Sequence, residues 1–211
     1  MKLKKLTVGI GNVNCYVVND EEGRGVIVDP GGGKRSILDY IEQEGLSIKA
    51  IILTHSHYDH ILAVEDLQKE LQLPVWIHEA GEERLLKPEL NLSNSASVPS
   101  VSIKADKLLQ DGEEIRVGQL KLEIIHTPGH TPGGVCIKID DILLTGDTLF
   151  KGSVGRTDLA GGSYQQLADS ISQKVMKLDD QLSVYPGHLG QSTLGKERRR
   201  NQLVKRMLKE N

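Results

Sequence analysis

The sequence has 211 residues, of which 38% are hydrophobic and 26% are charged, and its formal net charge is −3. This length suits one domain with a buried core, and the small negative charge argues against a dedicated nucleic-acid binder. No apolar run approaches the roughly 20 residues of a membrane span, and the N-terminus lacks a signal-peptide pattern. We therefore expect a cytoplasmic protein that folds as a single domain over residues 1–211.

The first half of the chain alternates between strand and helix patterns. Runs rich in Val and Ile and bounded by turn residues predict strands at residues 2–8, 15–20, 25–30, 49–56 and 74–78. Apolar residues at helical spacing predict helices at residues 35–45 and 60–72. Residues 80–106 have a weaker pattern, which predicts a short helix and a long surface loop.

The second half repeats the strand pattern. We predict strands at residues 113–118, 119–127, 133–139, 141–147 and 182–188. A helix is expected over 164–177, and a basic helix at the C-terminus. Strands that are apolar on both faces need cover on both faces, so the pattern indicates two sheets packed face to face with helices outside.

The C-terminal segment is strongly basic. Seven basic and only two acidic residues follow Gly195. One interpretation is contact with an anionic partner. The other is the solvated face of a last helix, and this one is favoured by an apolar stripe at helical spacing formed by Leu203, Val204, Met207 and Leu208.

The segment THSHYDH is the clearest sign of chemistry in the sequence. It places His55, His57, Asp59 and His60 within six residues, directly after a predicted strand. His55 and His57 are two positions apart and can project to one face, while Asp59 and His60 follow where the chain turns into a helix. Imidazole and carboxylate groups in this density are ligands for Zn, Fe or Mn.

Three further segments each place one potential ligand where an apolar strand ends. They are TPGH with His130, LLTGD with Asp147 and VYPGH with His188. Each of these residues alone is weak evidence, since a lone His or a Gly-Asp turn is usually structural. Together with the THSHYDH cluster they indicate a metal site built on loops that a rigid scaffold holds.

This combination of motifs resembles the metallo-β-lactamase superfamily. Within it, TGDTLFKGSVGRTDLAGG and YPGHLGQST resemble the small glyoxalase II-like, or hydroxyacylglutathione hydrolase-like, branch. The resemblance extends from about residue 6 to residue 201. It implies an α/β fold, a four-layer αβ/βα sandwich of two mixed β-sheets with helices on the outer faces, and a metal site at one edge of the sheets.

The resemblance also implies a division of the ligands between two divalent metal ions, with zinc as the first expectation and iron or manganese as alternatives. One ion would be held by His55, His57 and His130, and the other by Asp59, His60 and His188, with Asp147 bridging them. Two adjacent cations lower the pKa of a shared water, so that hydroxide exists near neutral pH. Asp59 is the candidate catalytic residue, which orients that hydroxide or passes its proton to the leaving group.

Two other residues are candidates for supporting roles. Asp29 matches an aspartate that the superfamily has near its metal loop, and we expect it to orient a ligand by a hydrogen bond, with an ordinary turn before Pro30 as the alternative. Arg156 follows Asp147 on a loop and could bind a substrate carboxylate. Its alternative is an ion pair with Asp158.

We expect a metal-dependent hydrolase whose partner is a small-molecule thioester, with no membrane contact. A different reaction remains open, namely that of a mononuclear-iron persulfide dioxygenase using His55, His130 and Asp147. A metal-dependent phosphodiesterase or nuclease is a third possibility, which the acidic body of the chain disfavours. A β-lactamase is disfavoured because a bridging Asp147 resembles the thioester hydrolases, and the sequence leaves the oligomeric state open.

Overall fold

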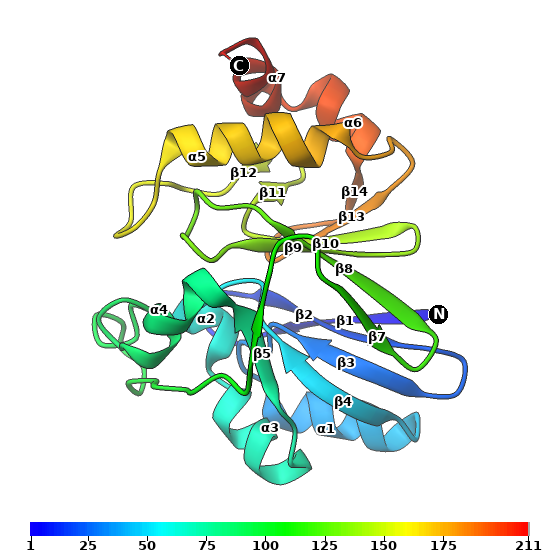
Figure 1. Ribbon diagram of the computed structural model, residues 1–211. Helices are drawn as coiled ribbons and strands as arrows, with labels where there is room; N and C mark the ends of the chain where they lie inside the picture. The colour runs from blue at the N-terminus through cyan, green and yellow to red at the C-terminus, as the bar shows by residue number, and fades with distance from the viewer. Residues whose placement is uncertain (211) are drawn as a thin grey trace.

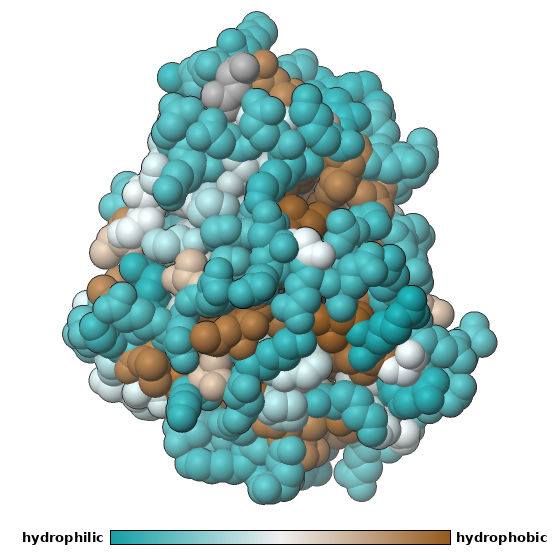
Figure 2. All heavy atoms as spheres, viewed as in Figure 1, coloured by the Kyte–Doolittle hydropathy of each residue, from teal (hydrophilic) through white to brown (hydrophobic). Residues whose placement is uncertain are grey.

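Two six-stranded β-sheets stack face to face across residues 1–210, which are the residues that the computed structural model describes (Figure 1). Helices cover the outer face of each sheet, so the predicted four-layer α/β sandwich is confirmed. Seen from the same side, the surface is mostly hydrophilic, with apolar side chains visible in a band across the middle of the molecule (Figure 2). Within residues 1–210, no helix combines the length and apolar character needed to cross a bilayer.

The first sheet has the order β1-β2-β3-β4-β5-β6. Neighbours are antiparallel from β1 to β3 and parallel from β3 to β6. Its strands are β1 (Lys2–Val8), β2 (Val13–Asn19), β3 (Arg24–Val28), β4 (Ser47–Ile52), β5 (Val75–His78) and β6 (Lys107–Leu109).

The second sheet has the order β14-β13-β10-β9-β8-β7, in which β10 and β13 are parallel and the other neighbours are antiparallel. Its strands are β7 (Glu114–Val117), β8 (Leu120–His126), β9 (Val135–Ile139), β10 (Ile142–Gly146), β13 (Ser183–Pro186) and β14 (Ser192–Thr193). A separate small hairpin consists of β11 (Leu149–Phe150) and β12 (Ser153–Val154).

The helices fall into two groups that follow the two halves of the chain. The first half contributes α1 (Lys34–Gln43), α2 (Tyr58–Ile61), α3 (Val64–Leu71), the 3₁₀ turn η1 (Glu79–Gly81) and α4 (Glu82–Leu86). The second half contributes α5 (Tyr164–Asp169), the π-helical η2 (Ser170–Lys174), the 3₁₀ turn η3 (Val175–Lys177), α6 (Leu194–Arg200) and α7 (Gln202–Glu210).

Strand β2 shows why the sequence specifies this layering. All seven of its residues are buried. Cys15 and Val17 point to one face and pack in the cluster under α1 and α3, whereas Tyr16 and Val18 point to the other and pack between the sheets. A strand covered on both faces needs apolar residues at successive positions, and residues 15–18 provide them here. A third apolar cluster joins the second sheet to α5 and α7.

Three predicted helices are interrupted in the structure. The helix expected over 60–72 is broken between α2 and α3, because the Ala63 amide donates to the Pro30 carbonyl at 3.0 Å instead of continuing the helical pattern. The helix expected over 164–177 changes from α to π to 3₁₀ geometry. The basic C-terminal helix is two helices, and the side chain of Asn201 between them accepts from the amides of Leu203 and Val204.

Candidate metal centre

The seven predicted metal ligands all lie at one end of the two sheets, where strands of both sheets give way to loops. His55 and His57 follow β4, and Asp59 and His60 lie in α2. The other three belong to the second half: His130 in the β8–β9 loop, Asp147 directly after β10 and His188 after β13.

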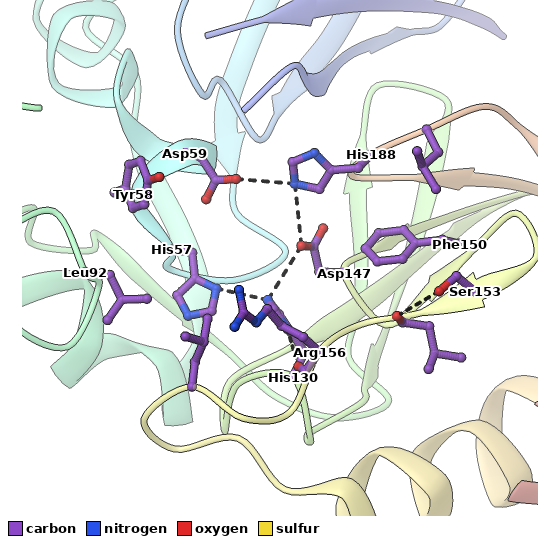
Figure 3. Close-up of a pocket in the computed structure, with 13 residues that line it drawn as sticks. His57, Tyr58, Asp59, Leu92, His130, Asp147, Phe150, Ser153, Arg156 and His188 are labelled. Carbon is purple, nitrogen blue, oxygen red and sulfur yellow. Dashed lines mark hydrogen bonds and ion pairs between the residues drawn. The ribbon is translucent and has the colours of Figure 1, made fainter. Parts of the chain in front are cut away.

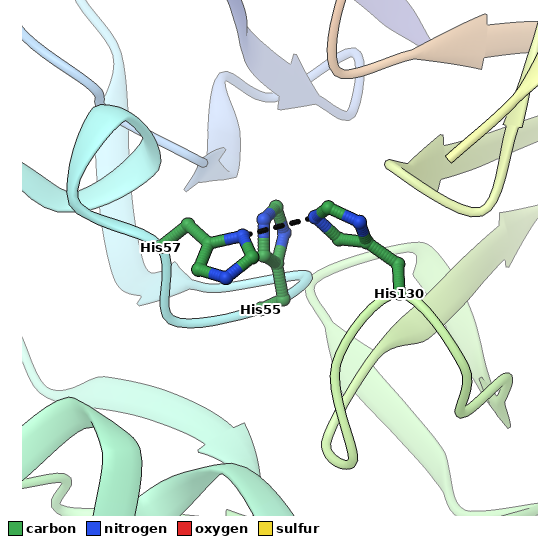
Figure 4. A group of neighbouring side chains, drawn as sticks. All are labelled: His55, His57 and His130. Atoms are coloured by element: carbon green, nitrogen blue, oxygen red, sulfur yellow. Dashed lines mark hydrogen bonds between the residues drawn. The ribbon is translucent and has the colours of Figure 1, made fainter. Parts of the chain in front are cut away.

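His55, His57 and His130 form the first group of candidate ligands (Figure 4). Their ligand atoms lie within 4.8 Å of one another, and all three residues are buried. Nδ1 of His57 and Nε2 of His130 are 2.9 Å apart. Two nitrogens bound to one tetrahedral zinc ion are about 3.3 Å apart for Zn–N distances of about 2.0–2.1 Å. The group is therefore close to the spacing that one ion requires.

Asp59, His60 and His188 form the second group. Oδ2 of Asp59 lies 3.3 Å from Nε2 of His188 and 3.9 Å from Nε2 of His60. His60 is fully buried, whereas the side chain of His188 is 23% exposed. The second group is thus the more open of the two.

Asp147 lies between the two groups (Figure 3). Its Oδ1 is 3.4 Å from Nε2 of His60, and its Oδ2 is 3.6 Å from Nε2 of both His130 and His188. Gly187 makes this approach possible, because a Cβ there would overlap the Asp147 carboxylate and the His60 ring.

Three of the histidines have Nδ1 held by an oxygen acceptor, which leaves Nε2 to face the centre. The acceptor is the Asp29 carboxylate for His60 at 2.9 Å, the Arg156 carbonyl for His130 at 2.8 Å and the Gly11 carbonyl for His188 at 3.1 Å. Such partners fix the tautomer and the ring orientation of a metal ligand.

Asp29 is itself fixed from several sides. Its Oδ1 accepts from the Thr54 amide at 2.7 Å, and its Oδ2 accepts from the Thr54 hydroxyl at 2.6 Å and faces Nδ1 of His60. The residue is buried and has a φ of 51°, in the left-handed region. We expected from the sequence that Asp29 orients a metal ligand by a hydrogen bond, and its contact with Nδ1 of His60 is of that kind.

Several buried atoms at the centre have no hydrogen-bond partner among residues 1–210. They include Nε2 of His55, Nε2 of His60 and Oδ1 of Asp147. Buried polar atoms without a partner are rare because their desolvation is costly. A cation bound among imidazole nitrogens and carboxylate oxygens would satisfy them, so the residues present fit a divalent metal.

The pKa values of the histidines differ between the two groups. Burial lowers the pKa of His57 to about 3 and also lowers the pKa of His55 and His130, so these rings are neutral at pH 7. The hydrogen bond to Asp59 raises the pKa of His188. Burial acts to lower the pKa of His60, but Asp147 and Asp29 outweigh it and raise the pKa.

A cleft of about 580 Å³ opens over the metal centre. Besides the candidate ligands, its walls include Arg156 and a set of apolar side chains: Leu92, Phe150, Val154, Leu159 and Leu189. The Arg156 guanidinium donates to both oxygens of Asp158, at 2.8 Å each. The ion pair considered as the alternative for Arg156 is thus present, and the same residue also lines the cleft.

Sequence reasoning missed several residues that support the ligands. Gly11 and Arg156 act through backbone carbonyls, which carry no signal in the residue type. Asn14 and Tyr16 contact the turn that bears His188. They do have a signal, because two polar side chains on the same face of an apolar strand need buried partners.

Comparison with known proteins gives a consistent result. A sequence profile of the metallo-beta-lactamase superfamily matches residues 8–188. The chain is 38% identical over 192 residues to the "Probable metallo-hydrolase YqgX" of Bacillus subtilis, covering 89% of this chain and 90% of that protein. It is 32% identical over 205 residues to the "Hydroxyacylglutathione hydrolase GloC" of Haemophilus influenzae, covering 95% and 97%.

Solved structures show the same fold. The chain matches the BLEG-1 B3 metallo-beta-lactamase with a TM-score of 0.92 and 34% identity, covering 96% of this chain and 99% of that one. It matches TTHA1623 in a di-iron-bound form with a TM-score of 0.83 and 33% identity, covering 94% and 98%. ETHE1 from Myxococcus xanthus matches with a TM-score of 0.80 and 28% identity, covering 99% and 88%.

Proposed function

The chain belongs to the metallo-beta-lactamase superfamily, and on that basis we propose that it hydrolyses a thioester of the hydroxyacyl-glutathione type at a centre of two divalent metal ions. The observation that carries this proposal is Asp147, whose two oxygens face His60 on one side and His130 and His188 on the other. A carboxylate can offer one oxygen to each of two cations, and its charge offsets their repulsion. The identity to the Haemophilus influenzae protein supports the substrate class.

Two divalent ions, when bound, supply a water of lowered pKa as the nucleophile and stabilise the negative charge that develops on the carbonyl oxygen. Asp59 lines the cleft beside the second group. Burial acts to raise the pKa of Asp59, but the hydrogen bond from His188 and the charge of His60 hold it below its usual range. Asp59 is therefore ionised at neutral pH and can accept a hydrogen bond that orients the attacking water.

The reaction needs no further co-reactant. Water supplies the oxygen of the C–O bond that forms at the carbonyl carbon, the C–S bond and one O–H bond of the water break, and the departing sulfur takes up the released proton. The products are a carboxylic acid and a thiol. The apolar walls of the cleft suit the carbon skeleton of such a substrate. Arg156 provides a cation for a substrate carboxylate, because an exposed ion pair such as that with Asp158 contributes little and exchanges readily.

A mononuclear-iron persulfide dioxygenase is the second candidate. The residues that it would use lie together, since His55 and His130 belong to the first group and Oδ2 of Asp147 is 3.6 Å from Nε2 of His130. The second group weighs against it, since the ligand atoms of Asp59, His60 and His188 also lie within 4.8 Å of one another. Seven ligands exceed what a single tetrahedral ion uses.

Metal content and a substrate panel test the proposal together. Protein loaded with zinc, iron or manganese would be assayed against a hydroxyacyl thioester, a persulfide, a β-lactam and a phosphodiester. We expect about two ions per chain and highest kcat/KM with the thioester. One ion per chain after reconstitution, with oxygen consumed on the persulfide, would identify the dioxygenase, and preferential turnover of either remaining compound would also refute the proposal.

A further inference from the structure

The turn that carries His188 is held from the opposite end of the sequence. The Asn14 side-chain amide donates to the Pro186 carbonyl at 3.0 Å and to the Leu189 carbonyl at 2.9 Å. The Asn14 backbone amide donates to the Gly187 carbonyl at 2.7 Å. The Tyr16 hydroxyl donates to the Pro186 carbonyl at 2.7 Å. These four bonds join β2 of the first sheet to the end of β13 in the second.

The second sheet contributes one further bond to the turn, from the Gly187 amide to the Gly146 carbonyl at 2.8 Å. Strand β13 ends at Pro186, and Leu189 is 60% exposed with a φ of +68°, in the left-handed region that a leucine rarely adopts. The His188 side chain makes a direct contact with the same N-terminal segment, through the Gly11 carbonyl. Asn14 and Tyr16 are each only 2% exposed, so their bonds to the Pro186 carbonyl are shielded from water.

The first group of ligands has different supports. Its residues follow β4 and lie in the β8–β9 loop, and Nδ1 of His130 is held by the Arg156 carbonyl. Within residues 1–210, no hydrogen bond joins Asn14 or Tyr16 to any of the three. Since neither residue contacts the first group directly, we expect a perturbation of β2 at these positions to act on the second group.

We propose that Asn14 and Tyr16 are positioning residues for the second metal ion. By holding the turn on both sides of His188, they set the affinity of the group formed by Asp59, His60 and His188, and they leave the affinity of the first group unchanged. We call Asn14 and Tyr16, with their four bonds to the turn, the clamp. The same turn places Leu189 in the cleft wall, so the clamp also fixes one side of the substrate site. This inference rests on the two-metal centre of the proposed function.

The variants Asn14→Ala and Tyr16→Phe test the clamp. Asn14→Ala removes two of the four bonds, and Tyr16→Phe removes one while Asn14 still serves the same carbonyl. Loss of a group that orients a metal ligand typically weakens metal affinity about 10–100-fold. We expect a change of about that size for the second ion in Asn14→Ala and a smaller one in Tyr16→Phe, with the first ion unaffected in both.

Tyr185→Phe provides a matched control. Tyr185 immediately precedes Pro186 and packs edge-on against Tyr16, but none of the hydrogen bonds to the turn involves it. Stepwise zinc titration against a chromophoric chelator measures both affinities, and thermal melting checks folding. Saturating zinc should restore kcat in Asn14→Ala, and a melting temperature of the zinc-free variant close to that of Tyr185→Phe would exclude a general loss of stability as the cause of the weaker binding.

The outcomes separate the two proposals. If the unmodified protein binds a single ion, the two-metal centre itself is wrong. If it binds two, and Asn14→Ala and Tyr16→Phe leave the second affinity unchanged or weaken both ions equally, the clamp is wrong. Should Asn14→Ala fail to fold, Tyr16→Phe against Tyr185→Phe still decides, because each removes only a hydroxyl.

Discussion

Acidification should release one metal ion well before the other. In the metal-free protein, the hydrogen bond to Asp59 raises the pKa of His188, and Asp147 and Asp29 raise that of His60 against the effect of burial. Both rings have Nδ1 engaged, so the extra proton sits on Nε2, the atom that a metal needs. A cation entering the second group must displace these protons.

The size of the effect follows from the number of protons displaced. At pH values below the raised pKa of a ring, each proton that the metal must displace lowers the apparent metal affinity about tenfold for every unit by which the pH falls. From pH 6.5 to 5.5 the second group should therefore lose about tenfold in affinity if one ring is protonated and about 100-fold if both are. The first group has fewer such protons to lose, since burial lowers the pKa of His57 to about 3 and also lowers the pKa of His55 and of His130.

Zinc titration at pH 6.5, 6.0 and 5.5 measures this difference. The variant His188→Gln assigns the sites, because it should remove the pH-dependent one and retain the other. Equal pH slopes for both ions, or survival of the pH-dependent site in His188→Gln, would refute the reasoning.

Three substitutions test the remaining assignments. Asp147→Asn keeps the size of the side chain but loses its charge, so we expect loss of the second metal and a fall in thioester hydrolysis of about 10²-fold or more. The variant should still melt cooperatively, and two bound metals with normal activity would count against the bridging role of Asp147. Arg156→Ala should raise KM for a carboxylate-bearing substrate more than it lowers kcat, and Asp158→Asn, which frees the guanidinium, should lower KM. If KM is unchanged in both variants, Arg156 serves only the ion pair with Asp158. Gly187→Ala should reduce both metal content and hydrolysis, because the added methyl overlaps Asp147 and His60, and full metal content by elemental analysis would contradict this.

The fold and the grouping of the candidate ligands could be predicted because their signals are local. The THSHYDH segment places four candidate ligands within six residues, and the strands that end at Asp147 and His188 are apolar at successive positions. The interruptions of the helices were not predicted. The Ala63 amide donates to the carbonyl of Pro30, a residue more than 30 positions away, instead of to a carbonyl of the helix. No local sequence pattern indicates such a contact. Asn201, by contrast, is a common helix-capping residue and was a readable signal.

The contacts that orient the candidate ligands were harder to predict than the candidates themselves. His130 and His188 are oriented by carbonyls, which every residue has, so Arg156 and Gly11 are not distinguished by their type. Asn14 is 172 positions from Pro186, and only the stacking of the two sheets brings them together. Arg156 could be placed near the site but not assigned a partner, because Asp158 and a substrate offer the same carboxylate chemistry.

The division of the ligands between the two sheets has a consequence for folding. Four of the seven side chains precede or lie in α2, and three follow strands of the second sheet, so neither half holds a complete site alone. Bound metal thus acts as a cross-link between the two halves of the chain. If the halves separate, the site loses ligands and releases its metal. A ligand at 1,000 times its Kd stabilises the folded state by about 4 kcal/mol, which is a large share of the 5–15 kcal/mol typical of a domain. Metal supply would then govern how long the chain stays folded, as well as how fast it turns over substrate.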